Sequence, residues 1–123
     1  MKEIIMVGLG GAAGSILRYL SSQFVQKYYN GHFPLATFTI NVIGCLLIGV
    51  LIGYFSKTQV LQNEWKLLLI TGFCGGYTTF SAFASENLNL INNNQIGLAL
   101  FYIALSVFLG IGAVWLGLLL SRA

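Results

Sequence analysis

Four apolar segments constrain this 123-residue chain more than any other feature. They cover about residues 4–26, 35–55, 67–90 and 96–120. A helix needs roughly 20 mostly apolar residues to cross the hydrocarbon of a bilayer, and each segment meets that length. Only 7% of the residues are charged, whereas soluble domains carry about 25%. We therefore predict one all-α membrane domain over residues 1–123, with four transmembrane helices.

The remaining composition excludes several other classes of protein. A net charge of +3 from six Lys/Arg and three Asp/Glu makes no basic patch, so nucleic acid is not an expected partner. The glycine-rich segment 8–14 imitates a dinucleotide-binding turn, but the acidic ribose ligand about 20 residues later is missing. The two cysteines lie in apolar runs without metal or redox spacing. We do not expect an enzyme.

Charged residues at the segment ends bear on orientation in the membrane. Four spans place both termini and the connection between the second and third segments on one side. That side holds Lys2, Lys57, Lys66 and Arg122, and the other holds Lys27, with Arg18 approaching it. The bias is too small to fix an orientation by the positive-inside rule. Insertion in both orientations is therefore a hypothesis that the sequence leaves open.

Glycines recur at a spacing that lets helices approach closely. Gly10 and Gly14, Gly49 and Gly53, and Gly72 and Gly76 each form a small-xxx-small pair. Such pairs serve tight packing within one four-helix bundle, or contact between protomers. A bundle of four short helices has little interior, so we expect an ion path to run between two protomers.

The third segment has an interruption near its middle. Gly75 and Gly76 are followed by Thr78 and Thr79, and this run is poor material for a continuous helix. We predict a third helix broken at mid-membrane by these glycines. Backbone freed at that depth must be buried in protein or line a polar cavity, and transporters bind Na⁺ at such carbonyls. A helix that is merely kinked is the alternative.

Polar and aromatic residues within the segments are candidates for function. Asn41 would serve either as an interhelical hydrogen bond or as a pore donor for an anion. Arg18 would either snorkel to the headgroups or provide positive potential at a vestibule. Phe80 and Phe83 share one helix face, and the positive edges of their rings would attract a small anion weakly. Glu86 lies closer to the end of the third segment than to its middle.

Three motifs carry a family resemblance over the whole chain. They are the glycine-rich opening that ends in Gly-x-x-x-Arg-Tyr (residues 14–19), the Asn-Val-Ile-Gly run at 41–44, and the run from Gly72 to Glu86. With these motifs the chain resembles the small bacterial fluoride channels of the Fluc (CrcB-type) family. The resemblance implies a fluoride-specific channel that passively exports fluoride across the bacterial cytoplasmic (inner) membrane and lowers its cytoplasmic concentration.

The resemblance also implies an assembly and a site. The assembly is an antiparallel, dual-topology homodimer with two fluoride pores along the protomer interface. A structural Na⁺ that is not transported sits at its centre, bound by the backbone carbonyls of Gly75 and Thr78 from both subunits. The pore residues would be Phe80, Phe83, Asn41, Ser81, Tyr102, Ser106 and Arg18.

One departure and two alternatives accompany this interpretation. Many relatives carry hydroxyl residues where this chain has Ala82 and Ala84, which puts the polar track of the pore in doubt. A proton-coupled small-molecule exporter is one alternative, with Glu86 as the coupling carboxylate. A non-catalytic interaction subunit held together by its glycines is the other.

Overall fold

The computed structural model describes residues 1–57 and 63–122, and within these ranges every regular element is a helix. Three spans are single helices: α1 (Lys2–Tyr28), α2 (Leu35–Lys57) and α6 (Ile96–Arg122). The third span joins α3 (Asn63–Lys66), the π-helix η1 (Leu67–Cys74), α4 (Gly75–Tyr77) and α5 (Phe80–Asn92). All four spans are long and apolar enough to cross a membrane. The prediction of an all-α fold with four such helices is confirmed.

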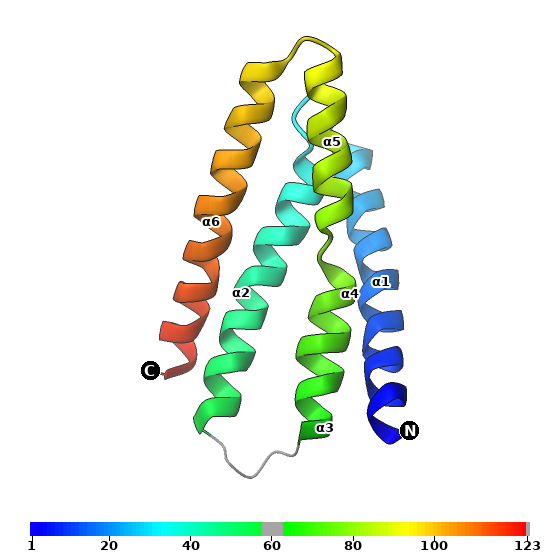
Figure 1. The fold of residues 1–123 in the computed structure, drawn as a ribbon, viewed down its shortest axis with the longest axis vertical. Helices are drawn as coiled ribbons and strands as arrows, with labels where there is room; N and C mark the ends of the chain where they lie inside the picture. The colour runs from blue at the N-terminus through cyan, green and yellow to red at the C-terminus, as the bar shows by residue number, and fades with distance from the viewer. Residues whose placement is uncertain (58–62, 123) are drawn as a thin grey trace.

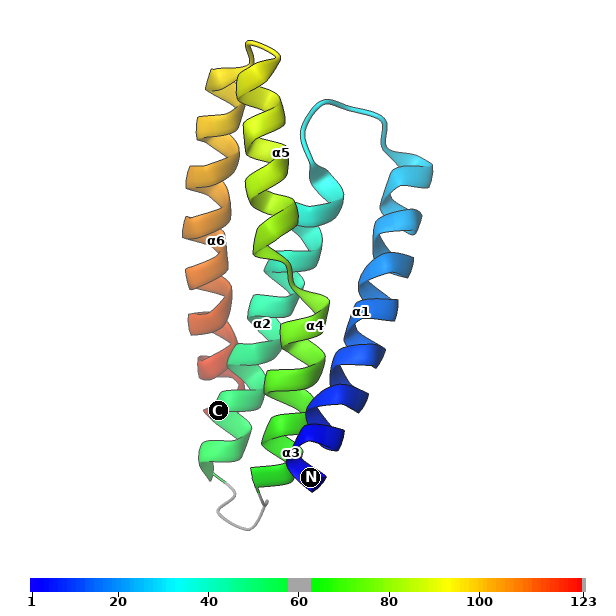
Figure 2. The same cartoon turned by 45° about the vertical axis from the view of Figure 1, so that its right-hand side comes forward.

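The four spans pack as two pairs. Both termini lie at the same end of the molecule as the end of α2 and the start of α3, while the α1–α2 and α5–α6 connections lie at the other end (Figure 1). The strongest contacts join α2 to α6, and α1 to η1 and α4. The partners in each pair run in the same direction, since alternate spans of the chain have the same direction (Figure 2).

Glycines bring these paired helices into backbone contact. A Cβ atom added to Gly76 would lie 2.7 Å from the carbonyl oxygen of Gly11, and one added to Gly72 would lie 2.8 Å from that of Val7. Between α2 and α6, a Cβ added to Gly117 would lie 2.7 Å from the backbone nitrogen of Val50. The three predicted small-residue pairs all lie at helix contacts within the chain.

We expect Gly76→Ala to destabilise the protein by about 1–3 kcal/mol, the usual cost of overpacking a close contact. The added methyl group would meet the backbone of α1, which cannot yield as a flexible side chain would. The matched control is Gly8→Ala, because nothing lies within 4 Å of a Cβ added at Gly8. Unfolding in detergent measures both. Equal stability of the two variants would contradict the close contact.

The third span bends at Thr78 and Thr79. Thr78 has φ −84° and ψ 159°, Thr79 has φ −149° and ψ 119°, and α5 begins immediately afterwards. The predicted break at mid-membrane is not confirmed as a break at Gly75 and Gly76, since both belong to α4 and Gly75 has φ −62° and ψ −39°; the span bends instead at the two threonines of the same run. The reason is that Gly76 serves close packing on α1, whereas β-branched threonines suit an extended backbone.

Candidate functional site

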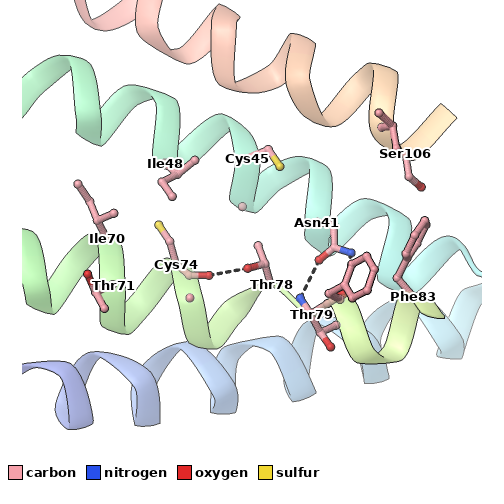
Figure 3. A pocket seen from close by; sticks show the side chains of 14 residues that line it. Asn41, Cys45, Ile48, Ile70, Thr71, Cys74, Thr78, Thr79, Phe83 and Ser106 are labelled. Atoms are coloured by element: carbon pink, nitrogen blue, oxygen red, sulfur yellow. Dashed lines mark hydrogen bonds between the residues drawn. The ribbon is translucent and has the colours of Figure 1, made fainter. Parts of the chain in front are cut away.

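Two cavities flank the bend in the third span. The first, of about 500 Å³, lies among α2, η1, α4, α5 and α6 (Figure 3). The second, of about 520 Å³, lies among α1, α2 and α5. Thr79 lines both. The first brings together six residues of the predicted site, namely Asn41, Gly75, Thr78, Phe80, Phe83 and Ser106. Arg18 and Ser81 line the second.

Asn41 holds the bend by pairing with both backbone groups of Thr79. The Thr79 N–H donates to Asn41 Oδ1 at 2.9 Å, and Asn41 Nδ2 donates to the Thr79 carbonyl at 3.1 Å (Figure 3). This geometry fixes which end of the amide is oxygen, because an N–H must meet an acceptor. The interhelical hydrogen bond is therefore present. An Asn side chain has two N–H hydrogens, so one is not used by this pair, and Asn41 lines the first cavity.

The same bend removes helical donors from carbonyl groups of the preceding turn, including those of Gly75 and Thr78. In a continuous helix Thr79 would donate to Gly75 and Ala82 would donate to Thr78. Here the Thr79 N–H turns to Asn41, and the Ala82 N–H donates to Thr79 Oγ1 at 3.2 Å. The Thr78 carbonyl keeps a long contact of 3.5 Å from Arg18 Nη1. Gly75 and Thr78 are the two residues for which the family resemblance implies carbonyl ligands.

Carbonyl oxygens without helical donors are the kind of ligand that unwound backbone offers to a hard cation such as Na⁺ in transporters. Among the described residues, no group of three or more His, Cys, Asp or Glu side chains is placed to hold a metal ion. Backbone oxygens at the bend are thus the candidate ligands. Gly75 lies on the first cavity, and its neighbour Cys74 already accepts two hydrogen bonds from Thr78, at 3.0 Å and 2.9 Å.

Phe80 and Phe83 lie on the first cavity with different surroundings. Their ring centroids are 5.7 Å apart and the rings are tilted by 45°. The Phe80 side chain is 78% exposed in a single chain. Phe83 is half-buried and packs against the ring of Tyr102, with centroids 4.9 Å apart and an interplanar angle of 61°. The first cavity therefore reaches the surface of the single chain at Phe80.

Tyr102 and Glu86 form a hydrogen-bonded group between the two cavities. Tyr102 is fully buried, and its hydroxyl donates to Glu86 Oε1 at 2.8 Å. The Thr37 hydroxyl donates to the other carboxylate oxygen at 2.6 Å. Glu86 lines the second cavity together with Arg18. The structure thus links α5 to α2 and α6 through one carboxylate, and Tyr102 itself lies behind Phe83.

The hydroxyl groups of the site differ in whether they have partners. The buried Ser106 hydroxyl has none within the described part of the chain, and Ser106 lines the first cavity. Ser81 lies 3.2 Å from Thr79, oxygen to oxygen. Ala82 lines the second cavity, where Ser81 and Ser85 still supply hydroxyls. Ser106 therefore brings a buried, unpartnered hydroxyl to the wall of the first cavity, and the second cavity keeps part of its polar lining.

Sequence reasoning missed the central position of Thr79. The Thr79 carbonyl accepts a hydrogen bond from Asn41, and the Thr79 hydroxyl caps the start of α5. The residue also lines both cavities. Its signal was present in the adjacent β-branched pair at residues 78 and 79, which favours an extended backbone. The pairing of Thr37 with Glu86 carried no comparable signal, because these residues are 49 positions apart.

The chain is similar to known proteins over nearly its entire length. A family model described as "CrcB-like protein, Camphor Resistance (CrcB)" matches residues 5–118. A protein of Flavobacterium psychrophilum is 52% identical over 122 residues, which cover 99% of this chain and 98% of the relative. A second, of Methylobacillus flagellatus, is 45% identical over 118 residues, which cover 95% and 92%. Each of these relatives is named "Fluoride-specific ion channel FluC".

Proposed function

Because the chain belongs to the CrcB-like family of ion channels, we propose that it is a fluoride-specific channel that exports fluoride passively across the bacterial cytoplasmic membrane. It is a multi-pass membrane protein and not an enzyme. The observation that carries the proposal is one cavity that gathers Asn41, Phe83 and Ser106 from three different elements. The relatives' printed names identify the anion.

The chemistry of the first cavity suits a small anion. Removing water from fluoride is costly, as it is for any buried charge, unless other donors replace the hydration shell. The remaining Asn41 N–H and the unpartnered Ser106 hydroxyl are such donors. Ring edges are weakly positive, so Phe80 and Phe83 would attract the ion without trapping it. Conduction needs this balance between entering and leaving.

We further propose that two chains form the pores as an antiparallel homodimer. The support is that Phe80 belongs to the first cavity and is nevertheless 78% exposed in a single chain. A second copy would cover this ring and close the cavity against lipid. The near balance of Lys and Arg between the two ends favours insertion in both orientations.

A growing cell provides the direct test of export. Expression of this chain in bacteria that lack their own fluoride exporter should restore growth in medium containing fluoride. The exported anion would leave down its gradient, so no energy source besides the membrane potential is required. Membrane-inserted protein that fails to restore growth would contradict the proposal.

The bend is also the proposed site of a structural Na⁺ held by the Gly75 and Thr78 carbonyls. A bound cation there would supply fixed positive charge that favours nearby anions. The support is the loss of the helical donors of both carbonyls to Asn41 and to Thr79. The two carbonyls of one chain are too few for a complete ligand shell, and the same pair from a second chain would add to it.

Replacement of Na⁺ by a much larger cation on both sides of the membrane should abolish fluoride flux. The larger ion would not fit among backbone carbonyls that are held in place by Asn41 and α5. Liposomes prepared in N-methylglucamine salts, compared with liposomes in sodium salts, measure the effect. Equal flux in the two salts would exclude a required Na⁺ and would leave the channel proposal standing.

Glu86→Gln distinguishes the channel from a proton-coupled exporter. We expect fluoride flux to continue in this variant, because glutamine keeps an acceptor for Thr37 or Tyr102. A coupled exporter would instead lose transport in this variant. In the described spans, Glu86 is the only carboxylate that does not lie within the first few residues of a span. Efflux is measured with and without a pH gradient. Flux that follows the gradient in the wild-type protein and disappears in the variant would favour the exporter.

A further inference from the structure

We propose that Phe33, in the connection between α1 and α2, is a positioning residue that holds the pore ring Phe83 in place through Tyr102. The inference rests on the proposed function for its effect on flux. It concerns a residue outside both cavities. The contacts that carry it run from Phe33 to Tyr102 and from Tyr102 to Phe83.

Phe33 is the centre of an aromatic cluster at the end of the molecule opposite the termini. Its ring centroid lies 5.5 Å from that of Phe38, 6.0 Å from that of Phe101 and 5.2 Å from that of Tyr102. The corresponding angles between the ring planes are 71°, 60° and 74°. All three contacts are edge-to-face, the arrangement that aromatic pairs prefer. Phe33 therefore joins the start of α2 to α6.

The backbone around Phe33 is restricted by the residues that follow it. The residue before a proline is restricted to extended conformations, and Pro34 follows Phe33 directly. The Phe33 carbonyl accepts a hydrogen bond from the Leu35 N–H at 2.8 Å, and the Pro34 carbonyl accepts one from Phe38 at 3.1 Å. The connection is thus tied to the first turn of α2.

Tyr102 transmits the position of this ring to the cavity. Its side chain is fully buried, and its ring centroid lies 5.2 Å from that of Phe33 and 4.9 Å from that of Phe83. Its hydroxyl is anchored to Glu86, so the ring has one fixed end. Close-packed interiors leave no room for a buried ring to shift unless a neighbour is removed. Removing Phe33 creates that room, and Phe83 loses the surface that sets its tilt.

Three variants test the proposal in the full-length protein reconstituted in liposomes. Phe33→Ala should lower fluoride flux by about tenfold, since small displacements of a positioned group cost up to 100-fold in other sites. Phe33→Tyr keeps the ring and should retain most of the flux. The matched control is Phe101→Ala, which removes a ring that also contacts Phe33 but is 54% exposed and lines neither cavity. It should conduct as the wild-type protein does.

A second measurement separates positioning from simple loss of stability. 4-Fluorophenylalanine at position 83 reports the surroundings of that ring by ¹⁹F NMR in detergent. Phe33→Ala should shift or broaden its resonance, whereas Phe33→Tyr and Phe101→Ala should leave it unchanged. An unchanged resonance in Phe33→Ala, or an equal change in Phe101→Ala, would overturn the proposal. A wild-type protein without fluoride flux whose resonance still responds to Phe33→Ala would overturn the proposed function alone.

Discussion

Replacing Asn41 with alanine should lower the free energy of unfolding by about 2–6 kcal/mol and abolish most of the fluoride flux. Alanine would leave both the N–H and the carbonyl of Thr79 without their partner. Each buried group that loses its hydrogen bond costs about 1–3 kcal/mol. The first cavity would also lose its amide donor. Stability and conduction therefore depend on the same side chain.

Asn87→Ala is the matched control for this prediction. Asn87 is a buried amide and Asn41 a half-buried one, but Asn87 Nδ2 donates within α5 to the Phe83 carbonyl at 2.9 Å, and its Oδ1 has no partner in the described part of the chain. Its loss should cost about 1 kcal/mol or less, with fluoride flux near that of the wild type. Unfolding in detergent and efflux from liposomes measure both variants. Equal losses for Asn41→Ala and Asn87→Ala would contradict the role of the Asn41–Thr79 pair.

Phe83→Ile and Phe80→Ile should each reduce fluoride flux by at least about tenfold, which corresponds to roughly 1.4 kcal/mol at the barrier. Isoleucine is apolar, as phenylalanine is, but it has no ring edge to offer an anion. Dimer formation should persist, because the substituted side chain keeps most of its apolar volume. For each variant, fluoride flux per channel and the oligomeric state in detergent are both measured.

The control for these two variants is Phe108→Ile on α6. Phe108 is 77% exposed, against 78% for Phe80, and it lines neither cavity. Phe80→Ile and Phe108→Ile therefore each remove a phenyl ring that is about equally exposed in a single chain. If Phe108→Ile reduces flux as much as Phe80→Ile and Phe83→Ile do, the ring edges have no special role. Unchanged flux in both Phe80→Ile and Phe83→Ile would likewise show that the ring edges have no special role.

The sequence predicted the four helices well because a membrane span is a local property of some 20 consecutive residues. Of the site residues that the motifs and the family resemblance named, Asn41, Phe83 and Ser106 meet on one cavity, whereas Arg18 and Ser81 line the other. The position of the bend was less accessible. Glycine is both a helix breaker and a contact residue, and here Gly76 packs on α1 instead of interrupting the helix.

The interactions that could not be predicted join residues far apart in the chain. The Asn41–Thr79 pair spans 38 positions and the Thr37–Glu86 bond spans 49. No periodicity or motif spacing encodes such pairings, which follow from how whole helices pack. The burial of Tyr102 behind Phe83 is of the same kind, because it depends on Phe33 arriving from a separate connection.

Anion efflux from liposomes containing only the purified protein addresses the proposed activity most directly. Liposomes loaded with sodium fluoride and sodium chloride are diluted into medium free of both anions, and each is followed with its own electrode. We predict rapid loss of fluoride with chloride retained at the level of empty liposomes. Equal efflux of the two anions, or retention of both, would contradict a fluoride-specific channel.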